Sequence, residues 1–478
     1  MTLLSRATLA SLPATVEAPL GRAGVTTGIV HFGPGAFHRA HQADYVDRLL
    51  DHDASWGIAA VSLRSRGTIE ALAAQDGLYT LAIRDAESRM RVIGAHTHFL
   101  GPEDAQDVRD LLIAPETRLV TTTITEKGYC LASDGTLDLA HPDIVHDLQQ
   151  NAVPRSVYGW LAGAIEKRAW RHAAPFVLMP CDNLTNNGGK FHAALVAFVR
   201  ATDDPAFADW IESEIRVPST MVDSITPASD DALYADVAAA LDVEDRAAVQ
   251  REDFAQWVIE DVGGLPDLAS VGATVTSDVA GYEKAKLRIL NGAHSTLAYA
   301  GLLRGHSSVA QAMGDEELAA FVDAMIRRDI MPMLPAVPGF DLDTYRAAVL
   351  KRFANPAIVH RLDQIAQDGS QKLPYRLGDT LLANRRAGRM PWHVVMALGC
   401  WVAFLVRRSA AGTAIVDPAA ESLVAAVAGA TPARAMAALI ERDLGIPAEL
   451  QADRDACAAL ESAAEAAFRG EISLRATE

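Results

Sequence analysis

Thr27-Gly-Ile-Val-His-Phe-Gly-Pro-Gly-Ala-Phe-His-Arg-Ala40 is the stretch of sequence that decides the fold. It reads as a short apolar strand, a glycine-rich turn and the start of a helix. Gly33 and Gly35 allow the backbone to turn tightly and to approach a pyrophosphate, whose charge the helix N-terminus then meets. His38 stands at the third position of the usual G-x-G-x-x-G pattern. The pattern favours a dinucleotide-binding turn, and an ordinary strand-to-helix turn remains the alternative.

Apolar runs that resemble strands recur through the first 280 residues and alternate with helical stretches. They are residues 28–32, 57–63, 118–125 and 176–179. Such alternation predicts an α/β domain with a doubly wound (Rossmann-type) parallel sheet. We place the boundary near residues 278–281 and expect a dinucleotide-binding domain over 1–280.

Ala-rich segments with a period of about 3.6 residues dominate the chain beyond Lys286, so we expect residues 281–478 to form a mostly α-helical substrate and catalytic domain. The segments with this period are 307–327, 391–406 and 421–442. The tail from 452 to 467 is rich in Ala and Glu and reads as a solvated terminal helix.

The segment 282–295 combines a possible base, an amide donor and an imidazole in Lys286, Asn291 and His294. If it is one helix at about 100° per residue, Glu283, His294 and Asn291 lie about 60°, 80° and 140° from Lys286. Lys286, Glu283 and His294 then interleave with an apolar stripe of leucines. The residues expected together on a separate, solvent-facing side are Lys284, Arg288 and Ser295.

Two interpretations of this helix remain open from its residues alone. A lysine in an apolar stripe loses hydration, and a pKa about three units below the ordinary ~10.4 makes it a competent base near neutral pH. Alternatively, the helix packs against a second domain, Lys286 and Glu283 form a structural ion pair, and His294 is a core histidine.

No recognisable set of metal ligands stands in the sequence. His38 and His41 are three residues apart, and such pairs more often contact an interface or a phosphate than a metal. The cysteines are widely scattered and form no C-x-x-C pair: Cys130, Cys181, Cys400 and Cys457. We therefore expect no metal site, and the cysteines suit a reducing compartment.

Motifs that run in order along nearly the whole chain match one family. They are Gly33–Gln42, Gln75–Thr80, Thr125–Tyr129, Cys181–Asn183, Met221–Asp223, Gln256–Asp261, Lys286–Asn291 and Asp368–Lys372. With them the chain resembles the mannitol dehydrogenase family, long-chain polyol dehydrogenases that also include fructuronate reductases. The resemblance implies a metal-free enzyme that moves a hydride between a nicotinamide cofactor and C2 of a polyol or sugar acid.

The resemblance also implies roles for the catalytic residues. Lys286 is the general base that takes the hydroxyl proton during oxidation. Asn291 and Asn183 donate hydrogen bonds to the developing alkoxide, and His294 holds the substrate oxygen in register. Asn183 follows the apolar run 175–180, where open α/β sheets place ligand contacts. Without the resemblance, Asn183 reads equally well as a turn residue that caps the next helix.

Other positions resemble proton-relay and substrate-binding residues of the family. Glu283 and Glu126 match acidic residues that pass the proton from the lysine to water, although either can also be a structural partner of a nearby lysine. Asp223 and Lys372 match residues that bind hydroxyls along the substrate chain. Arg361 lies in the same region and suits a substrate carboxylate, for which arginine is the bidentate partner; an exposed helix arginine is the alternative.

Two places in the sequence bear on specificity, and at the first of them the chain departs from the family. Gln364 stands where some members have an arginine, which leaves recognition of the far end of the substrate open. The second strand is followed by Arg64 and Arg66 rather than by an acid. By charge these arginines suit NADP, yet family members with similar residues use NAD, so we expect NAD and regard NADP as the less favoured cofactor. The expected cofactor-binding residues are Gly33, Gly35, Phe37, His38, Arg39 and Arg64.

Three functions follow from these expectations, in order of preference. The first is an NAD-dependent polyol 2-dehydrogenase that converts D-mannitol to D-fructose. The second is a fructuronate reductase, which interconverts fructuronate and mannonate by the same chemistry. The third is a catalytically silent nucleotide-binding protein, disfavoured because the residues expected to catalyse the reaction are all present.

Bulk composition agrees with a cytoplasmic enzyme of small molecules. The 478 residues carry a formal charge of −18, which disfavours nucleic acid and anionic membranes as partners. Half of the residues are hydrophobic, enough to fill two cores. Polar residues interrupt the N-terminal stretch, which therefore does not resemble a signal peptide. We expect a monomer or a small homo-oligomer.

Overall fold

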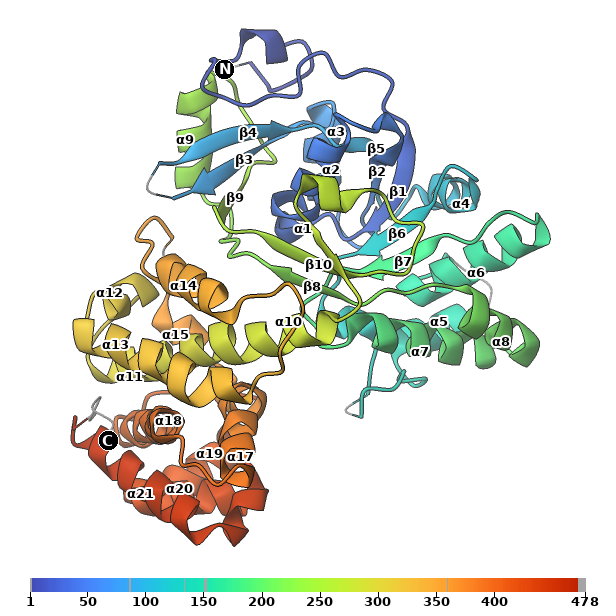
Figure 1. Ribbon diagram of the computed structural model, residues 1–478. Helices are drawn as coiled ribbons and strands as arrows, with labels where there is room; N and C mark the ends of the chain where they lie inside the picture. Colours follow the sequence, from blue (N-terminus) through green and yellow to red (C-terminus); the bar gives the residue numbers. More distant parts are fainter. Residues whose placement is uncertain (1, 86, 133, 150–152, 359, 472–478) are drawn as a thin grey trace. The chain divides into compact units, whose positions relative to one another are not determined.

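The computed structural model describes residues 2–85, 87–132, 134–149, 153–358 and 360–471 (Figure 1). The chain divides into an N-terminal unit, Met1–Val279, and a C-terminal unit, Ala280–Glu478. Each unit has its own core.

The N-terminal unit is built on a five-stranded parallel sheet with the order β5-β2-β1-β6-β7. Its strands are β1 (Thr27–Phe32), β2 (Gly57–Val61), β5 (His96–Leu100), β6 (Leu119–Thr122) and β7 (Val177–Pro180). The winding changes direction at β1, so a crevice for a ligand is expected at the C-terminal ends of β1 and β6. The predicted doubly wound sheet is confirmed.

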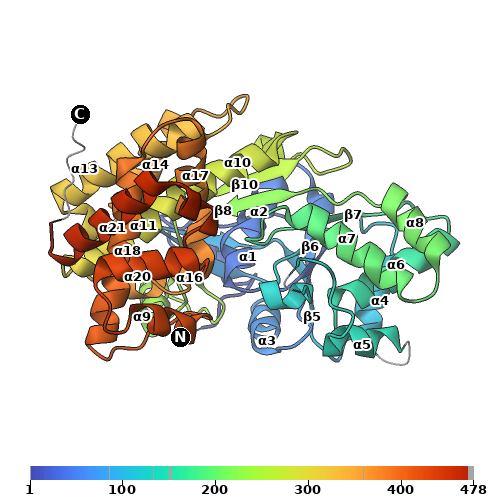
Figure 2. The same ribbon diagram turned by 90° about the horizontal axis from the view of Figure 1, so that it is seen from below.

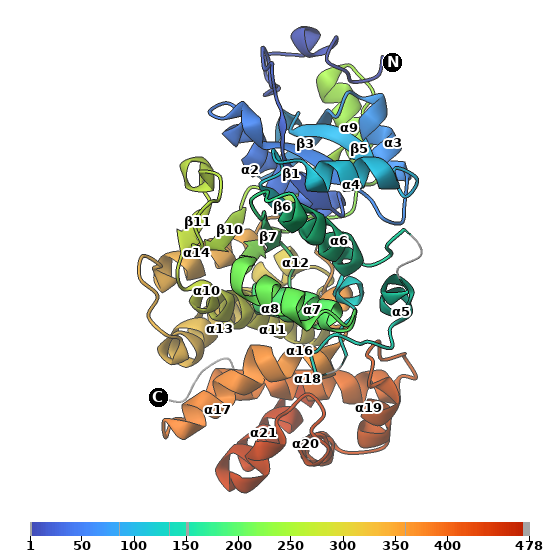
Figure 3. The same ribbon diagram turned by 90° about the vertical axis from the view of Figure 1, so that its right-hand side faces the viewer.

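Both faces of this sheet are covered, which explains why its strands read as apolar runs. Val30 and Phe32 pack into a cluster with helices α4 (Ala105–Ile113), α6 (Val157–Trp170) and α7 (Asn187–Arg200), whereas Ile29 packs with α2 (Gln42–Leu49) on the other face. Figure 3 shows α4 and α6 beside the strands, with α2 on the opposite side. The other helices of this unit are η1 (Leu9–Ser11), α1 (Ala36–Ala40), η2 (Ala54–Trp56), α3 (Gly67–Ala74), η3 (Glu126–Tyr129), α5 (Pro142–Leu148), α8 (Pro205–Glu214), α9 (Asp231–Leu241) and η4 (Leu268–Val271).

Two three-stranded sheets complete the N-terminal unit, and the sequence pattern did not predict them. One has the order β4-β3-β9 and the other β11-β10-β8, and each contains an antiparallel pair. Their strands are β3 (Tyr79–Arg84), β4 (Arg89–Ile93), β8 (Thr220–Asp223), β9 (Val249–Glu252), β10 (Gln256–Glu260) and β11 (Thr274–Thr276). These strands are short, and β9 pairs with a strand far earlier in the chain, so periodicity gives little sign of them. Helix α9 covers β3 and β4 (Figure 1).

The C-terminal unit contains only helices among its described residues, as predicted. They are α10 (Val279–Ala285, which starts at the boundary), the π-helix η5 (Lys286–Asn291), α11 (Gly292–Leu303), α12 (Val309–Met313), α13 (Glu316–Met325), the π-helix η6 (Ile326–Ile330), η7 (Met331–Met333), α14 (Leu342–Phe353), α15 (Leu362–Ile365), α16 (Gly369–Leu373), the π-helix η8 (Pro374–Gly378), α17 (Asp379–Arg386), α18 (Trp392–Ala410), α19 (Ala420–Val427), α20 (Pro432–Glu441), η9 (Ala448–Ala452) and α21 (Arg454–Phe468). Figure 2 shows α11, α18 and α21 packed together.

Helix α18 is the core of this unit. By length and composition it is long and apolar enough to cross a membrane. Yet 72% of its apolar stretch is buried inside the protein, as in the core helix of a globular domain. A Cβ at Gly399 would lie 2.7 Å from the backbone of Ala463, so the glycine allows α18 and α21 to approach closely. Leu460 and Ala464 of α21 are fully buried. The expectation of a solvated terminal helix is therefore wrong, because small alanines let this helix pack as part of the core.

Two of the segments with a helical period are each divided into separate helices in the structure. Residues 307–327 form α12 and α13, because Asp315 accepts a hydrogen bond from the Leu318 amide and starts a second helix. Residues 421–442 form α19 and α20, because Gly429 has a φ of +67° and Thr431 caps the helix that follows. A helix cap or a turn glycine thus ends a helix even where the hydrophobic period of the sequence continues.

A cluster of three imidazoles is buried in the N-terminal unit. The rings of His31 in β1 and His38 in α1 stack with centroids 3.5 Å apart, and His38 Nε2 lies 3.1 Å from His96 Nε2. Burial lowers the pKa of His31 and of His96 to about 3, and that of His38 well below its ordinary value. These rings are therefore neutral at physiological pH.

We expect the N-terminal unit to lose stability as the pH falls below about 6.5. The unfolded chain takes up protons at its histidines near that pH, whereas the folded cluster stays neutral until the pH approaches 3. At pH 5.5 each buried histidine then lowers the free energy of unfolding by about 1 kcal/mol. Asp182, whose pKa burial raises to about 7, changes in the opposite direction and offsets part of this loss. Urea unfolding at pH 7.5 and 5.5 measures the difference.

The matched variants are His96→Gln in the cluster and His172→Gln on the surface. The first should reduce the dependence of stability on pH and the second should leave it unchanged. Equal unfolding midpoints at both pH values in the unmodified protein would contradict the expectation.

Candidate functional site

The turn after β1 leaves space for a phosphate group against its backbone. Gly33 has a φ of +92°, and a Cβ there would lie 2.2 Å from the carbonyl oxygen of Thr123, so only glycine fits. A Cβ at Gly35 would meet nothing closer than 3.9 Å, which means that the backbone faces open space. Helix α1 has only five residues and ends at a kink at His41, so it is shorter than the sequence suggested. The turn fits a pyrophosphate through its exposed backbone rather than through a long helix dipole.

The other residues expected near the cofactor take different positions around this turn. Phe37 is half-buried and stacks on His41, with ring centroids 5.1 Å apart. His38 belongs to the buried histidine cluster. Arg39 is also buried, with its guanidinium carbon 5.8 Å from the centre of the Tyr79 ring. His38 and Arg39 thus support the turn from the protein interior, and direct contact with a cofactor stays a prediction.

Asp182 ties the ends of β6 and β7 together. One carboxylate oxygen accepts hydrogen bonds from the Tyr129 hydroxyl (2.7 Å) and the Thr122 hydroxyl (3.1 Å), and the other accepts one from the Ile124 amide (2.6 Å). Burial raises the pKa of Asp182 to about 7 against the lowering effect of these donors. These three hydrogen bonds fix the position of Asp182 and therefore of the neighbouring Asn183. Asp182 lies within the Cys181–Asn183 motif, but sequence reasoning gave it no role.

Asn183 and Glu126 come to the same edge of the parallel sheet. Asn183 follows β7 and Glu126 starts η3 after β6, and these two strands pair in parallel register. Both residues are exposed. Asp223 is the last residue of β8, in a separate sheet of this unit, and is 5% exposed. The fold thus brings an amide and a carboxylate to the edge where open sheets bind ligands.

A π-helical turn lies at the centre of the segment expected to be catalytic. It spans Lys286–Asn291, and the Gly292 amide donates to the Leu287 carbonyl oxygen, five residues earlier. The assumed spacing of about 100° per residue placed Asn291 about 140° from Lys286, and that spacing is wrong here. A π turn advances less than 100° per residue, so the angle between Lys286 and Asn291 is smaller than 140°. The wider turn therefore gathers the base and the amide donor more closely than sequence periodicity predicted.

The helix after this turn has no solvent face. Residues 292–301 of α11 are all buried, and Ser295 is 1% exposed. Arg288 is half-buried, and its guanidinium lies 3.7 Å from the Asp379 carboxylate. The expectation of a solvent-facing side with Arg288 and Ser295 is wrong, because the π turn rotates the residues that follow it and α18 packs against α11. Lys284 alone of that group is exposed.

His294 is buried in a largely apolar setting. Its ring stacks on Phe353 at a centroid distance of 4.5 Å and meets the edge of His360 at 4.6 Å. Burial, with smaller effects of His360 and two arginines, holds the pKa of His294 well below its ordinary value. Its Nε2 has no hydrogen-bond partner within the described part of the chain. A neutral imidazole with an unsatisfied buried nitrogen is suited to a ligand hydroxyl.

Arg376 is a half-buried residue of this region that sequence reasoning missed. Its Nη1 donates to the Ser295 hydroxyl (3.0 Å) and to the Asn291 carbonyl oxygen (3.5 Å). A Cβ at Gly292 would lie 3.1 Å from the Arg376 carbonyl oxygen, so the π-helices η5 and η8 approach closely. Burial lowers the pKa of Arg376. The one local signal is Pro374 at the start of η8, which interrupts a helical run.

Lys372 and Arg361, the expected substrate-binding cations, both have carboxylate partners. Lys372 Nζ donates to the Gln367 carbonyl oxygen at 2.9 Å and lies 3.2 Å from an Asp368 carboxylate oxygen. Arg361 precedes α15 on the surface, and its Nη2 lies 2.5 Å from an Asp363 carboxylate oxygen. The charge of Arg361 is thus offset, and no hydrogen bond within the described residues links Arg361 to the His294 region.

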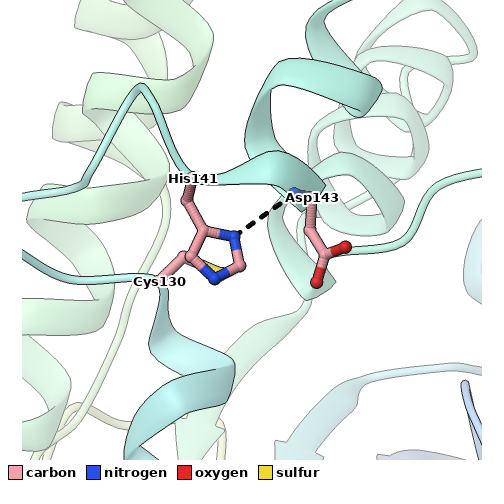
Figure 4. A group of neighbouring side chains, drawn as sticks. All are labelled: Cys130, His141 and Asp143. Carbon is pink, nitrogen blue, oxygen red and sulfur yellow. Dashed lines mark hydrogen bonds between the residues drawn. The ribbon is translucent and has the colours of Figure 1, made fainter.

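Cys130, His141 and Asp143 gather at the start of α5, with ligand atoms within 4.8 Å of one another (Figure 4). His141 Nδ1 accepts a hydrogen bond from the Asp143 amide at 3.3 Å, so this nitrogen is engaged and the proton of the neutral ring lies on Nε2. Asp143 already accepts a bond from Arg64 Nη2 at 2.7 Å. Burial raises the pKa of the Cys130 thiol to about 11. We interpret the trio as the capped start of a helix that anchors Arg64.

Comparisons with known proteins agree over both units. A model described as the mannitol dehydrogenase Rossmann domain matches residues 27–269, and one described as the mannitol dehydrogenase C-terminal domain matches residues 278–466. D-mannonate oxidoreductase of Escherichia coli K12 is 40% identical over 402 residues, 82% of each chain. A polyol:NADP oxidoreductase of Gluconobacter oxydans is 38% identical, over 78% of this chain and 79% of the relative. Mannitol 2-dehydrogenase of Pseudomonas fluorescens, solved with NAD and D-mannitol, has a TM-score of 0.82 at 34% identity over 99% of this chain and 98% of its own.

Replacement of Arg376 by Met should slow turnover and leave cofactor affinity unchanged. The Ser295 hydroxyl and the Asn291 carbonyl would lose a charged donor, and the π turn would no longer be held in place. We expect turnover to fall by roughly tenfold or more, with partial recovery in Arg376→Lys. Steady-state kinetics and cofactor titration provide the measurement.

Arg386→Met is the matched control, since the one ion pair that Arg386 forms among the described residues is an exposed pair with Glu449 in the same unit. It should retain full turnover. Unchanged turnover in Arg376→Met would show that this arginine does not position the segment.

Proposed function

Because the chain belongs to the mannitol dehydrogenase family, whose members are oxidoreductases of alcohol groups, we propose that it is an NAD-dependent polyol 2-dehydrogenase that converts D-mannitol to D-fructose. The observation that carries the proposal is the π turn with the helix that follows it. It places Lys286, Asn291 and the unsatisfied Nε2 of His294 on one short segment.

Each side chain of this segment has a chemical task in the proposal. Lys286 removes the proton of the C2 hydroxyl and returns it when a ketose is reduced. Asn291 and Asn183 donate hydrogen bonds to the oxygen as negative charge develops, without a metal ion. His294 is neutral, so its Nε2 either accepts from or donates to the substrate hydroxyl according to its tautomer. Glu283 and the exposed Glu126 relay the proton to water.

The N-terminal unit supplies the cofactor site of the proposal. The nicotinamide, when bound, accepts the hydride from C2. Gly33 and Gly35 let the backbone contact the pyrophosphate, Phe37 lies in α1 directly after this turn, and Arg64 lies in the turn that follows β2. Asp223 and Lys372 bind hydroxyl groups along the substrate. The substrate is a small molecule, and we propose a cytoplasmic enzyme that acts as a monomer or small homo-oligomer and has no nucleic-acid or membrane partner.

A second candidate, fructuronate reductase, has one observation in its favour, the 40% identity with a D-mannonate oxidoreductase. A sugar acid requires a cation for its carboxylate. Arg361, the residue proposed for this task from the sequence, is exposed and paired with Asp363. This pairing is the reason for preferring an uncharged polyol.

The direct test is absorbance at 340 nm with purified protein, NAD or NADP, and a panel of mannitol, arabinitol, sorbitol and mannonate. Fructose and fructuronate are assayed in the reverse direction. The proposal expects mannitol and fructose to give the highest kcat/KM with NAD. Dominant rates with mannonate and fructuronate would establish the second candidate, and no rate with any of them would overturn both.

An Arg361→Ala variant separates the two candidates within the same assay. Oxidation of mannitol should stay within about twofold of the unmodified rate, because Arg361 is exposed and paired with Asp363, and an exposed ion pair contributes little. A loss of roughly tenfold or more that is confined to mannonate and fructuronate would instead assign Arg361 to a substrate carboxylate.

A further inference from the structure

Both arginines in the turn after β2 are held by carboxylates. Arg64 Nη2 lies 2.7 Å from an Asp143 oxygen. Arg66 Nη2 lies 2.5 Å from a Glu103 oxygen, and its Nε lies 3.0 Å from a Glu70 oxygen. The turn itself contains no acidic residue, and the three carboxylates come from α3, from the loop before α4 and from α5. Two positive charges therefore face three negative ones.

The position of this turn connects it with the cofactor. Strand β2 pairs in parallel with β1, so the turn after β2 lies at the same edge of the sheet as the glycine turn at Gly33. In doubly wound sheets the end of the second strand meets the adenosine ribose, where an acid favours the 2′-hydroxyl of NAD and an arginine accepts the 2′-phosphate of NADP. Here the arginines are present, and the acids reach them from elsewhere in the fold.

We propose that Asp143 and Glu103 make the protein prefer NAD by keeping the guanidinium groups of Arg64 and Arg66 engaged. The inference rests on the proposed NAD-dependent function. A 2′-phosphate has to displace these carboxylates from the arginines and then lies beside uncompensated negative charges. A 2′-hydroxyl makes no such demand. The hydroxyls of Ser62 and Ser65, 3.3 Å apart in the same turn, are neutral groups suited to it.

Asp143 is the fixed partner of its pair and Arg64 the adaptable one. Asp143 lies in the first turn of α5, where the start of a helix favours a carboxylate, and its amide is bonded to His141 (Figure 4). The Asp143 side chain is 20% exposed, whereas that of Arg64 is 72% exposed. Removal of the Asp143 charge therefore releases Arg64 and leaves the start of α5 intact.

The test is a double variant, Asp143→Asn with Glu103→Gln, titrated with NAD+ and with NADP+ by calorimetry in the absence of any polyol. The ratio of the NADP+ to the NAD+ dissociation constant should fall by roughly tenfold or more, as expected for new charge-assisted hydrogen bonds to a phosphate. In the assay at 340 nm, relative kcat/KM should change in the same direction. If the double variant does not fold, Glu103→Gln alone should give a smaller change of the same sign.

Asp209→Asn with Glu212→Gln is the matched control. It removes the two carboxylates that hold exposed Arg200 on α7, and thus changes the net charge by the same amount away from β2. The ratio should not change in this variant.

Replacement of Arg64 and Arg66 by Ala in the double variant should cancel its gain. An unchanged ratio in the double variant, an equal change in the control or a gain that survives loss of both arginines would overturn the inference, as would tighter binding of NADP+ by the unmodified protein. Failure of the proposed function gives a different result. The unmodified protein would then fail to bind NAD+ and NADP+, or it would fail to oxidise any polyol.

Discussion

The wider helical turn at Lys286–Asn291 is the constraint on which the candidate active site depends. A regular α-helix would separate Lys286 from Asn291 by about 140°, whereas the π turn makes this angle smaller. Such a turn leaves backbone groups imperfectly bonded, and Arg376 donates to the Asn291 carbonyl oxygen and to Ser295 nearby. In the C-terminal unit, a half-buried arginine and a close contact between two π-helices thus hold these side chains in place.

The N-terminal unit solves a different problem, since it has to accept an anionic dinucleotide in a chain with a formal charge of −18. The backbone of its glycine turn is open to a ligand at Gly35. Hydrogen bonds to the Asp182 carboxylate fix the ends of β6 and β7. Charge at the adjacent turn is balanced locally, because Asp143 holds Arg64 through an ion pair. Local ion pairs of this kind, rather than the net charge of the chain, govern which ligands bind at this edge of the sheet.

Local sequence patterns predicted some of these features and could not predict others. Strand β1 and the turn at Gly33 were recognisable, because a buried strand and a positive φ each restrict the residues allowed. The π turn was not, because a hydrophobic period averages over a single widened turn. Arg376 and Asp143 were also missed as partners of Asn291 and Arg64, since pairs separated by 85 and 79 positions leave no local pattern. Tertiary packing alone brings such residues together.

Turnover of a Lys286→Ala variant, with and without added primary amines, tests the central claim most directly. If Lys286 is the base, NAD+ affinity should be retained, turnover should fall by roughly a hundredfold to ten-thousandfold, and small amines should restore part of it. Turnover equal to that of the unmodified protein would contradict the assignment of Lys286 as the base.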